Sequence, residues 1–255
     1  MIFVSDLDKT LVFSGYPEHC CVEYHQGKEI TYMTQKGYEI LKGLISKPDF
    51  RFIPCTLRSI EQTLRIEFIS PEQIPIIICD NGFSIYVNGK LERDWDKQMQ
   101  QELSHYPNQE TKRVIEEYIT TNHIDISQVK SNRNAFYTVI FNDKVTAEAN
   151  SQNITSFINP NLYKWDLQGR KLYIIPKFLD KSLAVQHLRE LLPNEHILTA
   201  GDSSVDCQLV SVGDKSIIPA HATIQVPNAL VTKATGIEAG EEILHQVKIW
   251  YEQRS

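Results

Sequence analysis

The strongest constraint on the fold is a set of short, largely apolar runs that alternate with segments of helical periodicity. Runs this short, with apolar residues at nearly every position, are typical of parallel strands covered on both faces. They lie at residues 2–4, 50–54, 76–79, 197–200 and 216–219. Apolar residues at helical spacing follow at residues 38–45, 60–68, 181–192, 204–210 and 240–251. This alternation predicts an α/β protein with a Rossmann-like, doubly wound parallel sheet.

The middle of the chain has a different pattern. Its strands alternate polar and apolar residues, at 136–141 and in a hairpin of 162–165 and 172–175 around Gln168-Gly169. Helices are expected near residues 95–105, 110–121 and 146–157. Alternation indicates an antiparallel sheet with one covered face. We therefore expect a core of residues 1–83 and 177–255, with an inserted α+β module over residues 84–176.

Composition narrows the possible partners. The 255 residues carry a formal net charge of −6, which gives no general attraction for nucleic acid or an anionic membrane. An anionic substrate would therefore need local cations. The sequence has no run of about 18 apolar residues and no basic leader, so a cytoplasmic location is expected. The five cysteines lack CxxC spacing and are expected to be reduced thiols.

Polar residues that could carry chemistry follow the apolar runs. Because the carboxyl ends of parallel strands meet at one edge of a sheet, such residues can converge on one site. They form four groups: Asp6, Asp8 and Thr10; Thr56 and Arg58; Lys181; and Asp202, Ser203 and Asp206. So many carboxylates would repel one another, which favours a bound cation.

In order along the chain, these groups resemble the haloacid dehalogenase superfamily of hydrolases. Its signature is DxDxT after the first strand, Ser or Thr after the second, a distant Lys and a late GDxxxD. The inserted module and the segments 79–82, 176–182 and 201–203 resemble the branch with a type C2 cap, which holds Cof-like and sucrose-phosphate phosphatases. The resemblance covers essentially the whole chain. It implies a small phosphate ester, expected to be a sugar phosphate, as substrate, and Mg²⁺ as cofactor.

The resemblance also implies roles for individual residues. Asp6 would be nucleophile and metal ligand, and Asp202 would supply a second carboxylate to the metal. Asp8 would give the metal its backbone carbonyl, protonate the leaving oxygen and then activate water. Thr56 and Lys181 would bind the phosphoryl group. Behind these residues, Asp206, Thr10 and Ser203 would orient them.

Other features of the resemblance concern the substrate. Arg58 is either a substrate contact or a solvated residue at a helix start. The cap would close by hinging near residues 83–86 and 175–177, and its basic candidates for specificity are Arg93, Lys112, Arg133 and Lys164. Residues 14–28 form a polar stretch where the family has a mobile flap. We expect the histidines there, at 19 and 25, to be exposed.

Three positions depart from the common family pattern: Lys9 and Leu57 each replace a glycine, and Val205 replaces an asparagine. Alternative functions remain at this point. Asp8-Lys9-Thr10 is similar to the DKT of cation-pumping ATPases, but no membrane segment accompanies it. A phospho-acceptor receiver domain would be about half as long, with adjacent acids after its first strand. A phosphomutase of the same superfamily stays possible, and oligomeric state is not fixed by the sequence.

Overall fold

The computed structural model describes residues 1–253, which form two compact units. The core unit contains the chain before Arg93 and after Leu179, and the inserted unit is Arg93–Leu179. Within residues 1–253, every helix is too short or too polar to cross a membrane. The α/β class expected from the sequence is confirmed, with a parallel core sheet and separate antiparallel sheets.

The core unit is organised around a five-stranded parallel sheet with the order β14-β13-β12-β1-β4. Its strands are β1 (Ile2–Ser5), β4 (Arg51–Pro54), β12 (Ile197–Ala200), β13 (Lys215–Ile218) and β14 (Leu230–Val231). All four residues of β1 are buried, as expected for the central strand of a sheet covered on both faces. The short strand β14 was not expected from the sequence.

The sheet edge beyond β4 is extended by β5 (Ile76–Cys79), which joins it through a parallel bridge between Cys55 and Ile78. The segment Asp80–Gly82 then reverses the chain through three residues with positive φ. This confirms the turn expected after the strand. Two antiparallel strands follow, β6 (Ser84–Val87) and β7 (Lys90–Leu91).

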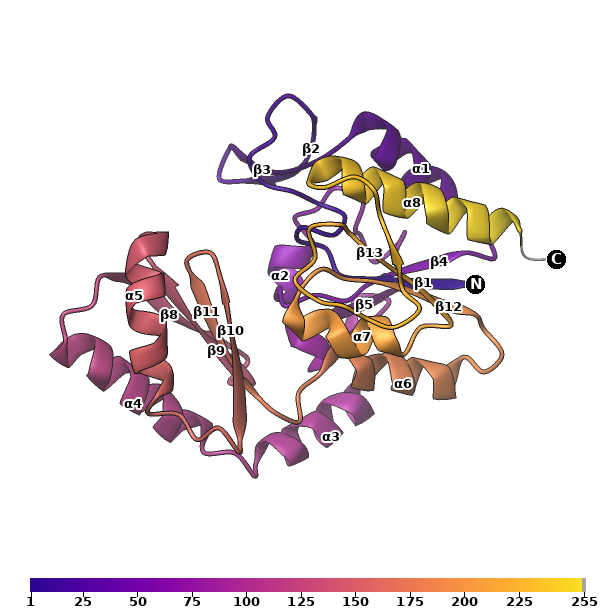
Figure 1. Cartoon of the computed structure of the whole chain (residues 1–255). Coiled ribbons are helices and arrows are strands. Elements are labelled where there is room, and N and C mark those ends of the chain that lie inside the picture. Colours follow the sequence, from indigo (N-terminus) through magenta and orange to yellow (C-terminus); the bar gives the residue numbers. More distant parts are fainter. Residues whose placement is uncertain (254–255) are drawn as a thin grey trace. The chain divides into compact units, whose positions relative to one another are not determined.

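Helices cover both faces of the core sheet (Figure 1). One face carries α1 (Gln35–Ile45) and α8 (Ile237–Glu252), and the other carries α6 (Lys181–Leu191) and α7 (Cys207–Ser211). A short 3₁₀ segment, Ser204–Asp206, precedes α7. Thr34 begins α1 by accepting a hydrogen bond from the Gly37 backbone N–H at 3.0 Å.

Two local expectations were wrong. The helix expected over residues 60–68 is only α2 (Ile60–Thr63), because Ile66 instead forms an antiparallel bridge with Glu23. The polar stretch before residue 28 is not a plain loop: it contains β2 (Cys20–His25), which pairs with β3 (Lys28–Met33). Gln26 and Gly27, with φ of 52° and 74°, form the two-residue turn.

The inserted unit has a four-stranded antiparallel sheet with the order β10-β11-β9-β8. Its strands are β8 (Ile126–Asn132), β9 (Phe136–Phe141), β10 (Tyr163–Gln168) and β11 (Lys171–Pro176), and its helices are α3 (Arg93–Leu103), α4 (Asn108–Thr121) and α5 (Lys144–Thr155). Residues of α4 and α5, such as Ile119 and Ile154, pack with Val139 and Leu172 of the sheet. One face of this sheet is therefore covered, as its alternating sequence predicts, although β8 was not expected.

Candidate active site

Three neighbouring strands of the core sheet bring the candidate residues to one edge. Asp6 directly follows β1, Thr56 lies two residues beyond β4, and Asp202 lies two residues beyond β12. The ladder continues past the strand ends, since the Asp6 N–H donates to the Ala200 carbonyl at 3.0 Å. The sequence-based expectation that these strand ends meet agrees with the order β12-β1-β4.

Lys181 reaches the same edge from the first turn of α6. The side chain of Asp180 accepts the Ser182 N–H at 2.9 Å and thereby fixes the start of the helix. The Lys181 side chain is fully buried, and its Nζ lies 2.5 Å from Asp6 Oδ1 and 2.6 Å from Asp206 Oδ1. Burial disfavours its charge, but Asp206 and Asp6 outweigh that effect and raise its pKa. Lys181 is therefore a cation held between two carboxylates.

Asp206 organises the turn that carries Asp202. Its Oδ2 accepts the Ser203 N–H at 3.1 Å, the Ser203 hydroxyl at 2.8 Å and the Asp202 N–H at 3.3 Å. Gly201 permits this packing, because a Cβ there would lie 2.4 Å from Asp206 Cβ. Both oxygens of Asp206 thus have protein donors, which matches an orienting role.

Three carboxylates of the site lie close together, and their burial and mutual repulsion are unfavourable. Asp6, Asp202 and Asp206 each offer a carboxylate oxygen, and these oxygens lie within 4.8 Å of one another. Burial, then repulsion from Asp206, raises the pKa of Asp202 to about 7, although Lys9 and Lys181 oppose the rise. Burial also raises the pKa of Asp6 well above its ordinary value, even with Lys181 beside it. A hard divalent cation with oxygen ligands, such as Mg²⁺, fits this donor set.

The loop after β1 has an unusual backbone at the position where the family commonly has glycine. Lys9 has φ of 62°, a left-handed conformation that costs about 1–2 kcal/mol for a residue with a Cβ. His221 braces this loop: its Nδ1 accepts the Gly236 N–H at 3.1 Å, so its Nε2 carries the proton and donates to the Lys9 carbonyl at 2.8 Å. Thr10, next in the loop, donates its hydroxyl to Asp6 Oδ2 at 3.4 Å.

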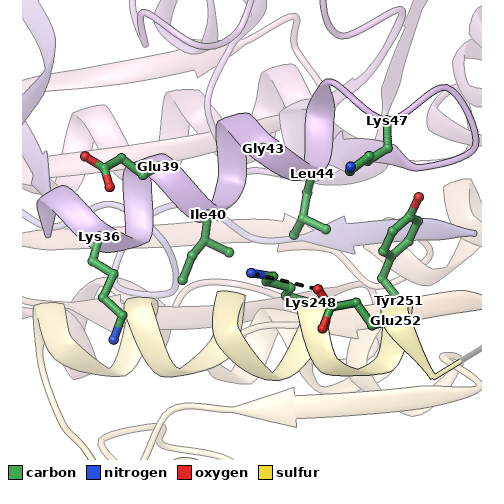
Figure 2. A pocket seen from close by; sticks show the side chains of 9 residues that line it. All are labelled: Lys36, Glu39, Ile40, Gly43, Leu44, Lys47, Lys248, Tyr251 and Glu252. Carbon is green, nitrogen blue, oxygen red and sulfur yellow. Dashed lines mark ion pairs between the residues drawn. The ribbon is translucent and has the colours of Figure 1, made fainter.

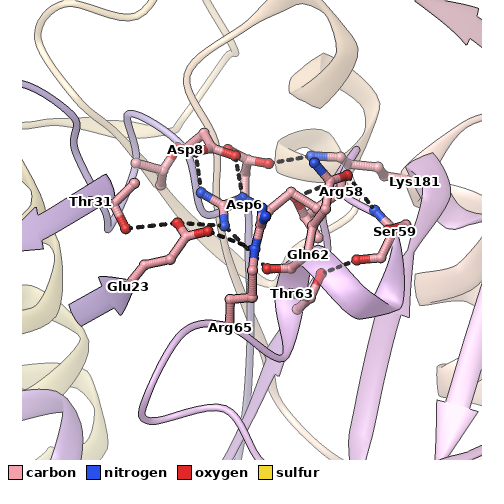
Figure 3. Close-up of polar contacts among 12 residues, drawn as sticks. Asp6, Asp8, Glu23, Thr31, Arg58, Ser59, Gln62, Thr63, Arg65 and Lys181 are labelled. Atoms are coloured by element: carbon pink, nitrogen blue, oxygen red, sulfur yellow. Dashed lines mark hydrogen bonds and ion pairs between the residues drawn. The ribbon is translucent and has the colours of Figure 1, made fainter. Parts of the chain in front are cut away.

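Asp8 and Arg58 form a two-point ion pair (Figure 3). Arg58 Nε lies 2.8 Å from Asp8 Oδ2, and Nη2 lies 2.7 Å from Asp8 Oδ1. The Asp8 side chain is 52% exposed, whereas that of Arg58 is 10% exposed. The interpretation of Arg58 as a solvated residue is therefore wrong. Thr56, which is buried, accepts the Arg58 backbone N–H at 3.1 Å and helps to place it.

The sequence analysis missed three residues near this pair. Glu23, Thr31 and Arg65 contact one another or Arg58, and Glu23 is fully buried. The missed signal was the alternating run on either side of Gln26-Gly27, which is a hairpin pattern. Recognising that hairpin would have placed Glu23 on a strand instead of in a polar loop.

A separate groove of about 460 Å³ lies between α1 and α8 (Figure 2). Lysines and glutamates share its walls, including Lys36, Lys248 and Glu252, with Ile40 and Leu44 between them. The Lys248 and Glu252 side chains pair at 3.8 Å. Because the residues that line the groove carry both charges and include none of the candidate catalytic residues, the groove does not belong to the site described above.

Solved structures with the same fold cover nearly the whole chain. A sucrose-phosphatase from Synechocystis sp., in complex with sucrose and phosphate, has a TM-score of 0.66 at 15% identity, covering 99% of this chain and 98% of the other. A haloacid dehalogenase-like hydrolase from Bacteroides thetaiotaomicron has a TM-score of 0.64 at 17% identity, covering 96% and 98%. A Thermoplasma acidophilum protein gives 0.65 at 16% identity, covering 98% and 97%. A search of curated proteins gave no match.

The fold is that of haloacid dehalogenase-like hydrolases, because structures of that description match it over nearly the whole chain. The sequence pattern described as sucrose-6F-phosphate phosphohydrolase matches residues 1–236, and the chain belongs to that family. It is therefore a phosphoric monoester hydrolase. Family membership excludes the receiver-domain alternative.

Proposed function

We propose that this protein hydrolyses a sugar phosphate through a phosphoryl group carried on Asp6, with Mg²⁺ as cofactor. One observation carries the proposal: the buried Lys181 ammonium lies between Asp6 and Asp206, with the Asp202 carboxylate close by. This arrangement provides a nucleophile, a fixed cation and spare carboxylate oxygens at one sheet edge. Family membership points to the same chemistry.

In the first half of the reaction, an oxygen of Asp6 attacks phosphorus and the bond from phosphorus to the leaving oxygen breaks. Asp8 donates a proton to that oxygen, so the sugar leaves as an alcohol. Asp8 suits this role because its side chain is more exposed than that of Asp6, which lies two residues before it. Lys181 stabilises the negative charge that the phosphoryl oxygens and Asp6 bring into the site.

In the second half, Asp8 takes a proton from water, and the water oxygen attacks the phosphorus on Asp6. The bond between phosphorus and the Asp6 oxygen breaks, which releases inorganic phosphate and restores the carboxylate. Thr56 is buried at the end of β4 and offers its hydroxyl to a phosphoryl oxygen in this proposal. Proton and phosphorus are thereby balanced over the two halves.

The metal would be held by the carboxylates of Asp6 and Asp202, with the Asp8 backbone carbonyl as a further ligand. Asp206 fits less well as a ligand because its Oδ2 alone accepts three protein donors, while its Oδ1 accepts Lys181. When bound, Mg²⁺ would neutralise charge on the phosphoryl oxygens. The raised pKa of Asp202, caused first by burial, supports a site built for a cation.

We also propose that the inserted unit is the cap and contributes the substrate's sugar contacts. Opposite the face covered by α4 and α5, the strand register places four side chains in one row. They are Lys130, Thr138, Tyr173 and Asp166. Donors, acceptors and one aromatic ring suit a polyhydroxylated ligand. Among the basic candidates, Arg133 pairs with Asp96 and Lys112 pairs with Glu116.

Release of inorganic phosphate from a panel of phosphomonoesters, with Mg²⁺ present, tests the proposal. The panel contains sucrose 6F-phosphate, hexose 6-phosphates, nucleoside monophosphates and p-nitrophenyl phosphate. We expect the highest kcat/KM for a sugar phosphate. If nucleotides were preferred, the substrate class would be wrong. If a hexose phosphate were isomerised without release of free phosphate, the protein would act as a phosphomutase.

A further inference from the structure

Glu23 is a fully buried acidic residue of the core unit that lies outside the proposed catalytic set. It lies on β2, and the pairing of β2 with β3 shifts register on both sides of it. Such irregularities re-aim a side chain out of the regular ladder. The bridge from Glu23 to Ile66, with the hydrogen bond from the Glu67 N–H to the Val22 carbonyl, ties β2 to the segment after α2. The side chain is fully buried.

Three side chains contact the buried carboxylate (Figure 3). Arg58 Nη1 donates to Oε2 at 2.9 Å, and the Thr31 hydroxyl donates to the same oxygen at 3.1 Å. Arg65 Nε lies 3.1 Å from Oε1, close enough for an ion pair but without hydrogen-bond geometry. A buried carboxylate is costly unless it is paired, so Glu23 and its arginines depend on one another.

Arg58 joins this buried carboxylate to Asp8. One edge of its planar guanidinium, Nε with Nη2, contacts both oxygens of Asp8, while Nη1 contacts Glu23. Because the guanidinium group is rigid, fixing Nη1 also fixes the edge that faces Asp8. The half-exposed Asp8 side chain is thereby linked, through Arg58, to the fully buried carboxylate of Glu23.

We propose that Glu23 is a positioning residue for phosphoryl transfer: it fixes Arg58, and through Arg58 it holds Asp8 where Asp8 meets the leaving oxygen. This inference rests on the proposed function of Asp8 as the proton donor. Because Glu23 lies on β2, the β2–β3 hairpin would contribute to catalysis as well as to the fold.

Glu23→Gln and Arg65→Gln separate positioning from simple anchoring. Both substitutions break the Glu23–Arg65 pair, but only the first also removes the charge that fixes Arg58. We expect Glu23→Gln to lower kcat/KM for the best sugar phosphate by about 10- to 100-fold, as is typical of residues that orient catalytic groups. Arg65→Gln should change it by about twofold or less. Equal losses in the two variants would overturn the proposal.

Comparing substrates with different leaving groups distinguishes a misplaced Asp8 from a general structural defect, which would lower kcat/KM equally for both. An alkoxide needs a proton to leave, whereas p-nitrophenolate leaves without one, so misplacing Asp8 harms the sugar phosphate more. Glu23→Gln should therefore lower kcat/KM for the sugar phosphate at least about fivefold more than that for p-nitrophenyl phosphate. An equal loss for both substrates would show a general defect and contradict the proposal.

A double-mutant cycle with Arg58→Gln tests the route of the effect. If Glu23 acts through Arg58, adding Glu23→Gln to Arg58→Gln should change kcat/KM by about twofold or less, because coupled residues are not additive. If the kcat/KM losses of the two single variants multiplied in the double variant, Glu23 would act independently of Arg58 and the proposal would be wrong.

The double variant Glu23→Gln/Arg65→Gln is the control for folding. It removes one anion and one cation, so the net charge of the cluster is unchanged. It should reproduce the selective loss seen with Glu23→Gln, and its failure to fold would assign Glu23 a structural role only. Absence of phosphate release by the wild-type protein would instead refute the proposed function itself.

Discussion

Two ionic clusters of the core unit differ in their balance of charge. The first contains the carboxylates of Asp6, Asp202 and Asp206 around the buried ammonium of Lys181. In the second, the carboxylates of Asp8 and Glu23 are matched by the guanidinium groups of Arg58 and Arg65. They are joined along the chain, because Asp6 and Asp8 belong to the same loop.

The difference assigns the clusters different tasks. In the balanced cluster two guanidinium groups match two carboxylates, with Arg58 contacting both, so the protein alone can hold it in one geometry. The unbalanced cluster keeps more negative charge than the protein neutralises, and the raised pKa values of Asp6 and Asp202, caused first by burial, express this. Such a cluster favours binding of an external cation or a proton, whereas the charges of the balanced cluster are paired within the protein.

The largest expected effect comes from replacing Asp6, the proposed nucleophile, in the unbalanced cluster. Asp6→Asn keeps the shape of the side chain but cannot accept the phosphoryl group. We expect phosphate release to fall by about 10⁴-fold or more, as for other covalent nucleophiles. The isosteric Glu252→Gln on α8, outside the site, is the matched control and should keep full activity. A folded Asp6→Asn protein with normal turnover would end the proposed mechanism.

The second-largest effect is expected from removing divalent metal, which should affect the unbalanced cluster and not the balanced one. A chelator should abolish phosphate release, and readdition of Mg²⁺ should restore it. Binding to the folded state alone should add about 2.7 kcal/mol to the free energy of unfolding at a Mg²⁺ concentration of 100 times Kd. Thermal unfolding with and without Mg²⁺ measures this. Arg65→Gln, which alters the balanced cluster, should show the same gain; wild-type protein with no gain would contradict the metal site.

Asp202 gives the unbalanced cluster a pH signature in metal-free protein. Its folded pKa is about 7, above its value of about 3.9 in an unfolded chain, so the folded state binds the extra proton. Stability from this group is therefore fully present below about pH 4 and is lost as pH rises to about 7. Asp202→Asn should remove this loss and be more stable by about 2 kcal/mol at pH 8.

Chemical denaturation of the metal-free proteins at pH 5 and pH 8 checks this expectation. The gain from Asp202→Asn should be larger at pH 8. Equal gains at both pH values would show that the carboxylate is not strained by its neighbours. The same variant should bind Mg²⁺ more weakly, so the stability gained by the metal-free protein should be opposed by a loss of Mg²⁺ stabilisation.

The sequence predicts the unbalanced cluster better than the balanced one for a physical reason. Asp6, Asp202 and Lys181 stand at strand ends or a helix start, where the fold class alone places side chains together. Glu23 comes from a hairpin and Arg65 from the turn after a short helix, and their meeting depends on register shifts in β2. Those shifts, like the early end of α2, arise from tertiary pairing between Glu23 and Ile66, which local periodicity does not encode.

Lys9 is a second example of what periodicity hides. The motif pattern showed that a lysine replaces the common glycine, but not that the backbone there remains left-handed, with φ of 62°. The loop keeps the glycine-like turn and gains a side-chain cation that lowers the pKa of Asp202. The bracing of the Lys9 carbonyl by His221 accompanies this strained backbone.

The smallest expected effect tests whether Lys9 partly offsets the missing balance. Lys9→Gln keeps a flexible polar side chain and removes the charge, so Mg²⁺ no longer meets the charge that acts on Asp202. We expect Mg²⁺ to bind about two- to tenfold more tightly, since a partly screened charge nearby contributes on the order of 1 kcal/mol. Titration calorimetry at pH 8 measures this. Unchanged or weaker binding would mean that Lys9 does not act on the metal, and its charge would then be free to serve the anionic substrate instead.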